Sequence, residues 1–127
     1  MLSRLRDGRR RPYRVAVARA YSKRFALRWL TGGWTTDTLY TVPAGKLAIV
    51  RSITMRNDNA SANRGNVIVQ ASTGTSPYLV GSDSIAGGGG SQQWHGLHLV
   101  LQAGEVLQAN AQLATLCLGV HGYELDA

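Results

Sequence analysis

Residues 38–57, which read TLYTVPAGKLAIVRSITMRN, constrain the fold of this chain more than any other segment. The side chains at 38, 40 and 42 alternate with those at 39 and 41 up to Pro43, and a second period of two begins at Leu47. Pro43 fixes φ at the second position of a turn, and Gly45 suits its last position. The segment therefore predicts a β-hairpin, in which a strand, a tight turn and a second strand follow one another.

The rest of the chain after Gly33 repeats this style, with short alternating runs separated by turn residues. Such a pattern is typical of an all-β sandwich or barrel, and no helix is expected after residue 33. Strands are expected at residues 35–42, 46–57, 65–72, 77–81, 92–101, 105–111 and 115–124. The polar stretch 58–66 and the glycine run 86–91 are expected to be exposed loops. Because the glycine run is expected to be loose, Gly45→Val should disrupt folding more than Gly89→Val.

Arg51 interrupts the apolar face of the strand predicted at residues 46–57. An unpaired charge on a buried face would be costly. Either a β-bulge near Arg51 and Ser52 switches the facing, or Arg51 meets an acidic partner at an interface. We favour the bulge.

Basic residues are concentrated near the N-terminus. Of 14 Lys and Arg against 7 Asp and Glu in 127 residues, residues 1–28 contain ten basic residues and one acidic residue, a net charge of +9, so the remainder carries −2. A chain of this length fits one domain. We therefore expect a basic N-terminal arm with a hinge, residues 1–33, and a β-sandwich body, residues 34–127. A chain that starts at Gly33 should then fold without the arm.

Residues 13–30 fit two patterns. Val17, Tyr21, Phe25 and Trp29 recur at intervals of four, with basic residues elsewhere, which indicates a basic amphipathic helix. The beginning of the segment also alternates as a short strand would. We favour a helix over the later part, so that the arm would be partly helical.

Three stretches carry a resemblance to a known family: LYTVPAGKLAIVRSITMRN at 39–57, WHGLHLVLQAGEVLQANA at 94–111 and LGVHGYEL at 118–125. They resemble the small β-sandwich structural proteins of tailed-bacteriophage virions, in which a strand ending in YxVPAGK leads into an AIVxSI strand. In that family the domain closes with a Gly-Asp/Glu turn and an aromatic-containing last strand. The resemblance implies a virion component with a single antiparallel, jelly-roll-like sandwich, and it brings no catalytic or ligand residues.

The residues give no sign of an enzyme or a metal protein. On a strand His95 and His98 point to opposite faces, and neither they nor His121 has a second cysteine to complete a zinc set. The sole cysteine, Cys117, also excludes an internal disulfide. The glycine run precedes a predicted strand rather than the helix that a phosphate cradle needs. We therefore expect no catalytic residue, cofactor, metal or small-molecule substrate.

The leading hypothesis is a non-enzymatic structural subunit of a tailed-bacteriophage virion, assembled in the host cytoplasm. Its sandwich would bind copies of itself, and its arm would dock on other virion proteins. The candidate partner-binding residues of the arm are Arg9, Arg10, Arg11, Arg14, Tyr21, Phe25 and Trp29. No membrane partner is expected, since no run reaches the ~18 apolar residues of a membrane span.

Other function classes stay open. The Arg-rich arm could bind nucleic acid, with arginines neutralising phosphates and aromatic residues stacking on bases. The same composition is typical of an organellar presequence. A carbohydrate-binding jelly roll would need a polar and aromatic face, which the sequence alone does not locate.

Overall fold

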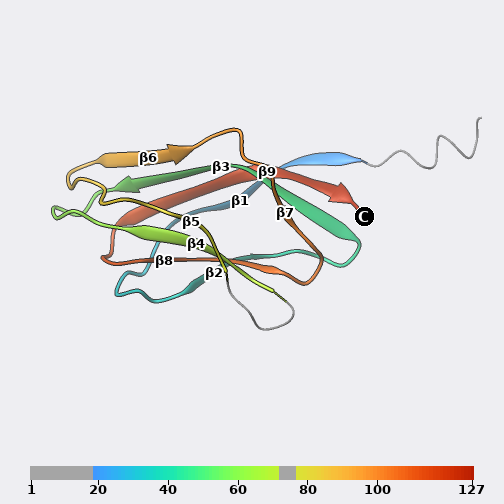
Figure 1. The fold of residues 1–127 in the computed structure, drawn as a ribbon, viewed down its shortest axis with the longest axis horizontal. Coiled ribbons are helices and arrows are strands. Elements are labelled where there is room, and N and C mark those ends of the chain that lie inside the picture. Colours follow the sequence, from blue (N-terminus) through green and yellow to red (C-terminus); the bar gives the residue numbers. More distant parts are fainter. Residues whose placement is uncertain (1–18, 72–76) are drawn as a thin grey trace, which may run out of the picture.

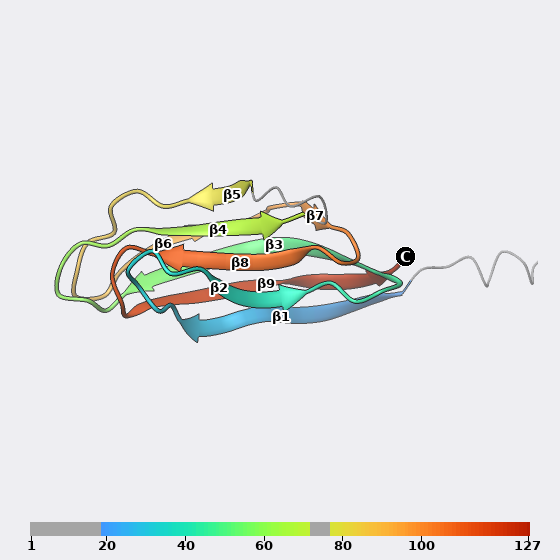
Figure 2. The same cartoon turned by 90° about the horizontal axis from the view of Figure 1, so that it is seen from below.

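The computed structural model describes residues 19–71 and 77–127, which form two antiparallel sheets packed face to face (Figures 1 and 2). The long sheet has the strand order β1-β9-β3-β6, and β7 pairs with β3 beyond the end of β6. The short sheet has the order β2-β8-β4-β5. The strands are β1 (Ala20–Trp29), β2 (Asp37–Thr41), β3 (Lys46–Asn57), β4 (Gly65–Gln70), β5 (Tyr78–Gly81), β6 (Gly90–Trp94), β7 (Leu99–Leu101), β8 (Val106–Ala111) and β9 (Leu116–Asp126).

The predicted all-β fold class is confirmed, because the described residues contain two antiparallel sheets and no helix. It follows that no helix long and apolar enough to cross a membrane occurs in the described ranges.

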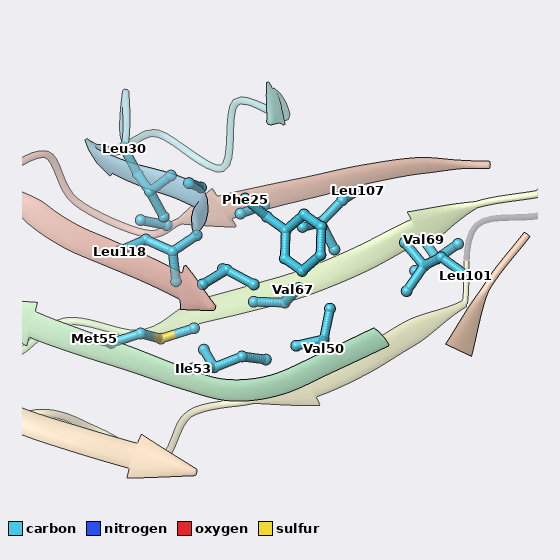
Figure 3. Packing of buried hydrophobic residues seen from close by; sticks show 14 of the residues in the cluster. Phe25, Leu30, Val50, Ile53, Met55, Val67, Val69, Leu101, Leu107 and Leu118 are labelled. Carbon is cyan, nitrogen blue, oxygen red and sulfur yellow. The ribbon is translucent and has the colours of Figure 1, made fainter. Parts of the chain in front are cut away.

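One apolar core fills the space between the sheets (Figure 3). The apolar residues of β3 and β9 that face inward are buried, as are their counterparts on β4 and β8. The largest of them include Ile53, Met55, Val67, Leu107, Leu118 and Val120. Burial of one such side chain contributes about 1.5–3 kcal/mol. The period-two pattern of the sequence is thus the pattern of this core.

The strands predicted after residue 34 all occur, with one division. The run expected at 92–101 is two strands, β6 and β7, because Gly96 adopts a φ of 66° between them. The bulge predicted near Arg51 is confirmed, since the pairing of β3 with β9 shifts register between Val50 and Ser52. Arg51 is consequently exposed while the apolar residues on either side of it stay buried.

The predicted hairpin is wrong, although its strands and its turn exist. β2 pairs with β8 in the short sheet, whereas β3 pairs with β9 in the long sheet. The turn therefore carries the chain from one sheet to the other. The longer ladder decides the pairing, because β3 matches β9 along its full length and could match the shorter β2 over only part of it.

The turn itself is displaced by one residue from its expected position. Lys46 N donates to Pro43 O at 3.2 Å, so Gly45, with a φ of 76°, is the third residue of the turn. A positive φ at the third position is the feature of a type II turn, which favours glycine there. The LQAGE corner between β7 and β8 repeats this plan, with a Glu105 N to Gln102 O bond of 3.0 Å.

The helix expected over the later part of residues 13–30 is also wrong, because β1 is a strand at the edge of the long sheet. A register shift against β9 between Arg24 and Ala26 buries two consecutive residues, Phe25 and Ala26. The bulge changes the strand period, so exposed and buried side chains no longer alternate. Such an interrupted alternation imitates the four-residue spacing of a helix.

The boundary expected at residue 33 must therefore move toward the N-terminus. Phe25 and Leu30 are 5% and 2% exposed and belong to the core, so β1 is part of the body. The glycine pair is no hinge. Gly33 N donates to Gln112 O at 2.9 Å, and a Cβ on Gly32 would lie 2.4 Å from Ala114 N. Residues 1–18 of the expected arm lie outside the described residues.

The two segments predicted to be exposed loops make specific backbone contacts with the rest of the domain. Asn63, within the polar stretch 58–66, is fully buried, and its backbone pairs with Ile85. In the glycine run a Cβ on Gly87 would lie 2.2 Å from Ala60 O, and Gly89 has a φ of 104°. The expectation that Gly89→Val is milder than Gly45→Val therefore has no structural support, since both glycines adopt left-handed backbone.

Candidate interaction surfaces

The candidate partner-binding residues of the arm fall into two groups, one outside the described residues and one on β1. Arg9, Arg10, Arg11 and Arg14 lie outside the described residues. The other three are on β1, where Tyr21 is 42% exposed, Trp29 is 52% exposed and Phe25 is buried. The ring of Phe25 packs 4.9 Å from that of Tyr40 inside the sandwich, so its side chain offers no surface to a partner. Tyr21 and Trp29 stay candidates.

Two cations of β1 bind carboxylates of the body rather than an external partner. Lys23 Nζ lies 3.4 Å from Glu124 Oε1, and Arg28 Nη2 lies 3.6 Å from Asp37 Oδ1. Both carboxylates are largely buried, so removal of either cation would leave a buried carboxylate without that partner. Part of the excess of basic residues near the N-terminus is therefore balanced by acidic residues of the same domain.

Asp37 also receives two hydrogen bonds from Thr31, from the backbone N at 2.8 Å and from the hydroxyl at 2.7 Å. Burial of Asp37 opposes ionisation, but these bonds and the nearby Arg28 outweigh it and lower the pKa of the carboxyl group below its ordinary value of 3.8. The carboxylate thereby fixes the connection between β1 and β2.

Residue 19 lies at the same end of the sandwich as the C-terminus (Figure 1). Asp126 N donates to Arg19 O at 3.2 Å, and Lys46 Nζ donates to Asp126 Oδ1 at 2.5 Å. That hydrogen bond raises the pKa of Lys46 above its ordinary value. Lys46 Nζ also lies 4.9 Å from the ring centre of Tyr21. Tyr21 is therefore held against β3 despite its exposure.

The outer face of the long sheet combines apolar and cationic side chains. Residues opposite one another in an antiparallel ladder share a face, which places Leu27 beside Gly119 and Trp29 beside Cys117. Leu27 and Trp29 are 56% and 52% exposed. A Cβ on Gly119 would lie 3.3 Å from His121 Cε1 and 3.8 Å from Leu27 Cδ1, so these two side chains lie over the buried glycine.

The cations of this face are Arg24 on β1 and Arg51 and Arg56 on β3, all exposed. In the strands of the long sheet only Glu124 and Asp126 are acidic, and both lie on the inward side, opposite to this face. We call the outer surface formed by Arg24, Leu27, Trp29, Arg56, Cys117 and Gly119 the docking face. Asp58, which directly follows β3, pairs with Arg56 at 2.9 Å.

The outer face of the short sheet is uncharged. The only charged residue in its strands is Asp37, which points inward. Amide side chains bond to one another across the outer face, with Asn66 Nδ2 donating to Asn110 Oδ1 at 3.0 Å and Gln108 Nε2 donating to Gln70 Oε1 at 3.3 Å. The two outer faces therefore differ in charge and in the type of polar group that they expose.

No cluster of metal-ligating side chains is present among the described residues. His95, His98 and His121 are exposed, and His95 bonds only to Gln93, at 2.8 Å. Within residues 19–71 and 77–127 no group of three His, Cys, Asp or Glu side chains converges. Cys117 is a free, half-buried thiol.

Sequence reasoning missed Leu27 as a surface residue because the four-residue spacing selected Phe25 instead. The sequence on the two sides of Phe25 nevertheless contains a signal for a strand. Tyr21, Lys23 and Phe25 alternate as a strand does, and the alternation resumes one residue out of step at Ala26. A strand with a one-residue insertion fits this pattern.

Comparison with known proteins gives structural similarity only. No protein-family model matches the chain, and no curated protein matches it. Among solved structures, a chain of infectious bursal disease virus strain Gt superposes with a TM-score of 0.45 at 12% identity. A chain of strain Gx superposes with a TM-score of 0.46, also at 12% identity. The superpositions cover 87% and 86% of this chain but 32% of each viral chain.

Proposed function

We propose that this protein is a non-enzymatic structural subunit of a tailed-bacteriophage virion. Its sandwich binds copies of itself, and it docks on neighbouring virion proteins through β1 and the basic segment that precedes it. The observation that carries the proposal is the exposed pair Leu27 and Trp29 on a sheet face whose strands direct cations, but no carboxylate, outward. Asp58, which directly follows β3, pairs with one of these cations, Arg56. The resemblance of residues 39–57, 94–111 and 118–125 to virion sandwich proteins supports a place in the virion.

The chemistry of the docking face favours a protein partner. Scattered apolar residues are normal on a protein surface, but Leu27 and Trp29 lie two residues apart on one strand and point to the same side. Tryptophan is among the residues that most often anchor interfaces. The surrounding arginines select an acidic partner and would repel a basic one.

Incorporation into particles tests this function. The amount of the chain in purified virions is measured by quantitative mass spectrometry for the wild type, Leu27→Ala/Trp29→Ala and Val100→Ala. Val100 is a matched control, because it is 49% exposed on β7 of the same sheet, away from Trp29. We expect at least a tenfold loss for the double variant and none for the control. Absence of the wild-type chain from particles, or equal incorporation of all three chains, would contradict the proposal.

A second candidate function is nucleic-acid binding through the basic segment and the docking face. Arg24 and Arg51, which are exposed on a face whose strands direct no carboxylate outward, favour it, whereas Arg56 is paired with Asp58. Binding to a single-stranded oligonucleotide would then weaken steeply with salt. Arg24→Gln/Arg51→Gln would reduce the salt slope by about 0.7 for each phosphate that the variant no longer neutralises. Binding that is absent at low salt would exclude this candidate.

A further inference from the structure

The two edges of the long sheet are built differently. β1 carries Lys23, Arg24 and Arg28 and has a bulge at Phe25. Charged side chains and bulges are the devices by which natural edge strands avoid pairing with other chains. The opposite edge strand, β6, contains no charged residue. Only one edge of this sheet is therefore protected.

β6 also keeps a regular ladder with β3. The pairing runs without a register shift from Ile53 with Trp94 to Asn57 with Gly90. β6 is the last strand of its sheet and lies at the margin of the molecule, with β3 as its one ladder partner (Figure 1). A straight, uncharged edge strand is a template for a further strand.

The outward backbone groups of β6 have no partner in the described part of the chain. Apart from the ladder with β3, no hydrogen bond there uses a backbone N–H or C=O of residues 91–94. The side chain of Gln92 accepts a hydrogen bond from Asp83 N at 3.2 Å. In an antiparallel ladder, alternate residues direct their N–H and C=O groups away from the neighbouring strand. The edge of β6 thus presents donors and acceptors that a second strand could pair with.

We propose that β6 pairs antiparallel with β6 of a second copy of this chain, about a two-fold axis at Gln92, so that two long sheets become one. This inference rests on the self-association in the proposed function and names its surface. A two-fold interface brings the same strand from both subunits together. In this register Gln92 faces the partner's Gln92, Ser91 faces the partner's Gln93, and Trp94 faces the partner's Gly90.

The side chains of β6 are complementary to themselves in this register. No like charges oppose one another, and the hydroxyl and amide groups of Ser91 and Gln93 can hydrogen-bond across the pair. Trp94, the one bulky residue, faces a glycine, so that it meets no second side chain of the ladder and packs beside the partner's Ala86, whose O lies 2.4 Å from the position of a Cβ on Gly90. Pairing of two β1 strands would instead bring cations together across a bulge.

Sedimentation of the full chain over a range of concentrations tests the pairing. Ser91 and Gln93 are exposed, so Ser91→Lys/Gln93→Lys adds charges without disturbing the core. Each new lysine then faces a lysine of the partner. We expect the dimer dissociation constant to rise at least tenfold. Ala20→Lys/Ser22→Lys is the matched control, because it adds the same charges to exposed positions of the other edge strand and should leave the constant unchanged.

Disulfide trapping tests the register. In a Cys117→Ser background, Gln92→Cys should crosslink with the partner's Gln92→Cys, because opposite Cα atoms in a ladder lie within disulfide range. Gln93→Cys, which faces Ser91 of the partner, should crosslink more slowly. Equal crosslinking would overturn the register.

The outcomes separate this inference from the function on which it rests. A chain that is monomeric at every concentration would overturn both the self-association and the β6 pairing. A chain that associates equally well with Ser91→Lys/Gln93→Lys would overturn the β6 pairing alone, and self-association through another surface would stand.

Discussion

Tyr40 of β2 donates a hydrogen bond from its phenol to Glu124 of β9, which joins the short sheet to the long sheet inside the sandwich. Glu124 is 8% exposed, and its second oxygen pairs with Lys23 of β1. Three strands from both sheets therefore meet at one carboxylate. A buried charge of this kind depends on all of its partners.

Tyr40→Phe should destabilise the fold by about 1–3 kcal/mol, because it removes a hydrogen-bond donor from a buried carboxylate and leaves the ring in place. The free energy of unfolding from urea denaturation measures this. Tyr21→Phe is the control, since Tyr21 is exposed. Equal stability of the two variants would show that the Tyr40–Glu124 bond contributes nothing.

Asn63→Ala should cost about 2–4 kcal/mol, because Asn63 satisfies several buried backbone groups at once. Its Oδ1 accepts from Arg64 N and Leu113 N, both at 2.8 Å, and its Nδ2 donates to Leu113 O at 2.9 Å. Asn66→Ala, which removes the half-buried amide pair with Asn110, should cost less in the same denaturation assay. The reverse order would contradict the account.

Gly87→Ala should lower the melting temperature more than Gly88→Ala does, although the two glycines are neighbours. A Cβ on Gly87 would lie 2.2 Å from the backbone oxygen of Ala60, so the main chain must move. A Cβ on Gly88 meets nothing within 4 Å and adds only the strain of a φ of 72°. Similar melts would indicate that the glycine run is a loose loop after all.

The stability contributed by Asp37 should depend on pH. Its folded pKa is below its ordinary value of 3.8, so the carboxylate stabilises the fold above about pH 4, and this contribution is lost as the pH falls through the folded pKa. The difference in unfolding free energy between the wild type and Asp37→Asn should therefore be constant down to about pH 5 and shrink below it. A difference that grows on acidification would have the wrong sign.

The strands after residue 34 could be predicted because their faces alternate against one core. Pairing was harder to predict. The turns at Gly45 and Gly104 look like hairpin turns in the sequence, but they are sheet-to-sheet corners bonded to each other, with Gly104 N donating to Val42 O at 2.9 Å. The turn residues determine only where the chain bends. Which strands then pair depends on contacts with strands that are distant in the sequence.

The sequence did not predict β1 as a strand of the domain, for a related reason. A bulge at Phe25 disrupts its alternation, and its charges suggested an external partner, whereas Lys23 and Arg28 pair with Glu124 and Asp37. Of the candidate partner-binding residues, Trp29 lies on the docking face, but Phe25 lies in the core. Ion pairs between distant segments leave no local signal in one sequence.

Truncation tests the central claim most directly, namely that β1 is part of the sandwich. A chain starting at Arg19 and a chain starting at Gly33 are compared with the full chain by circular dichroism and thermal melting. Phe25 and Leu30 are core residues, and β1 pairs with β9 from Ala20 to Trp29. The first truncated chain should melt cooperatively near the full chain, and the second should be unfolded or aggregated. A chain starting at Gly33 that melts cooperatively as a β-rich monomer would contradict the account.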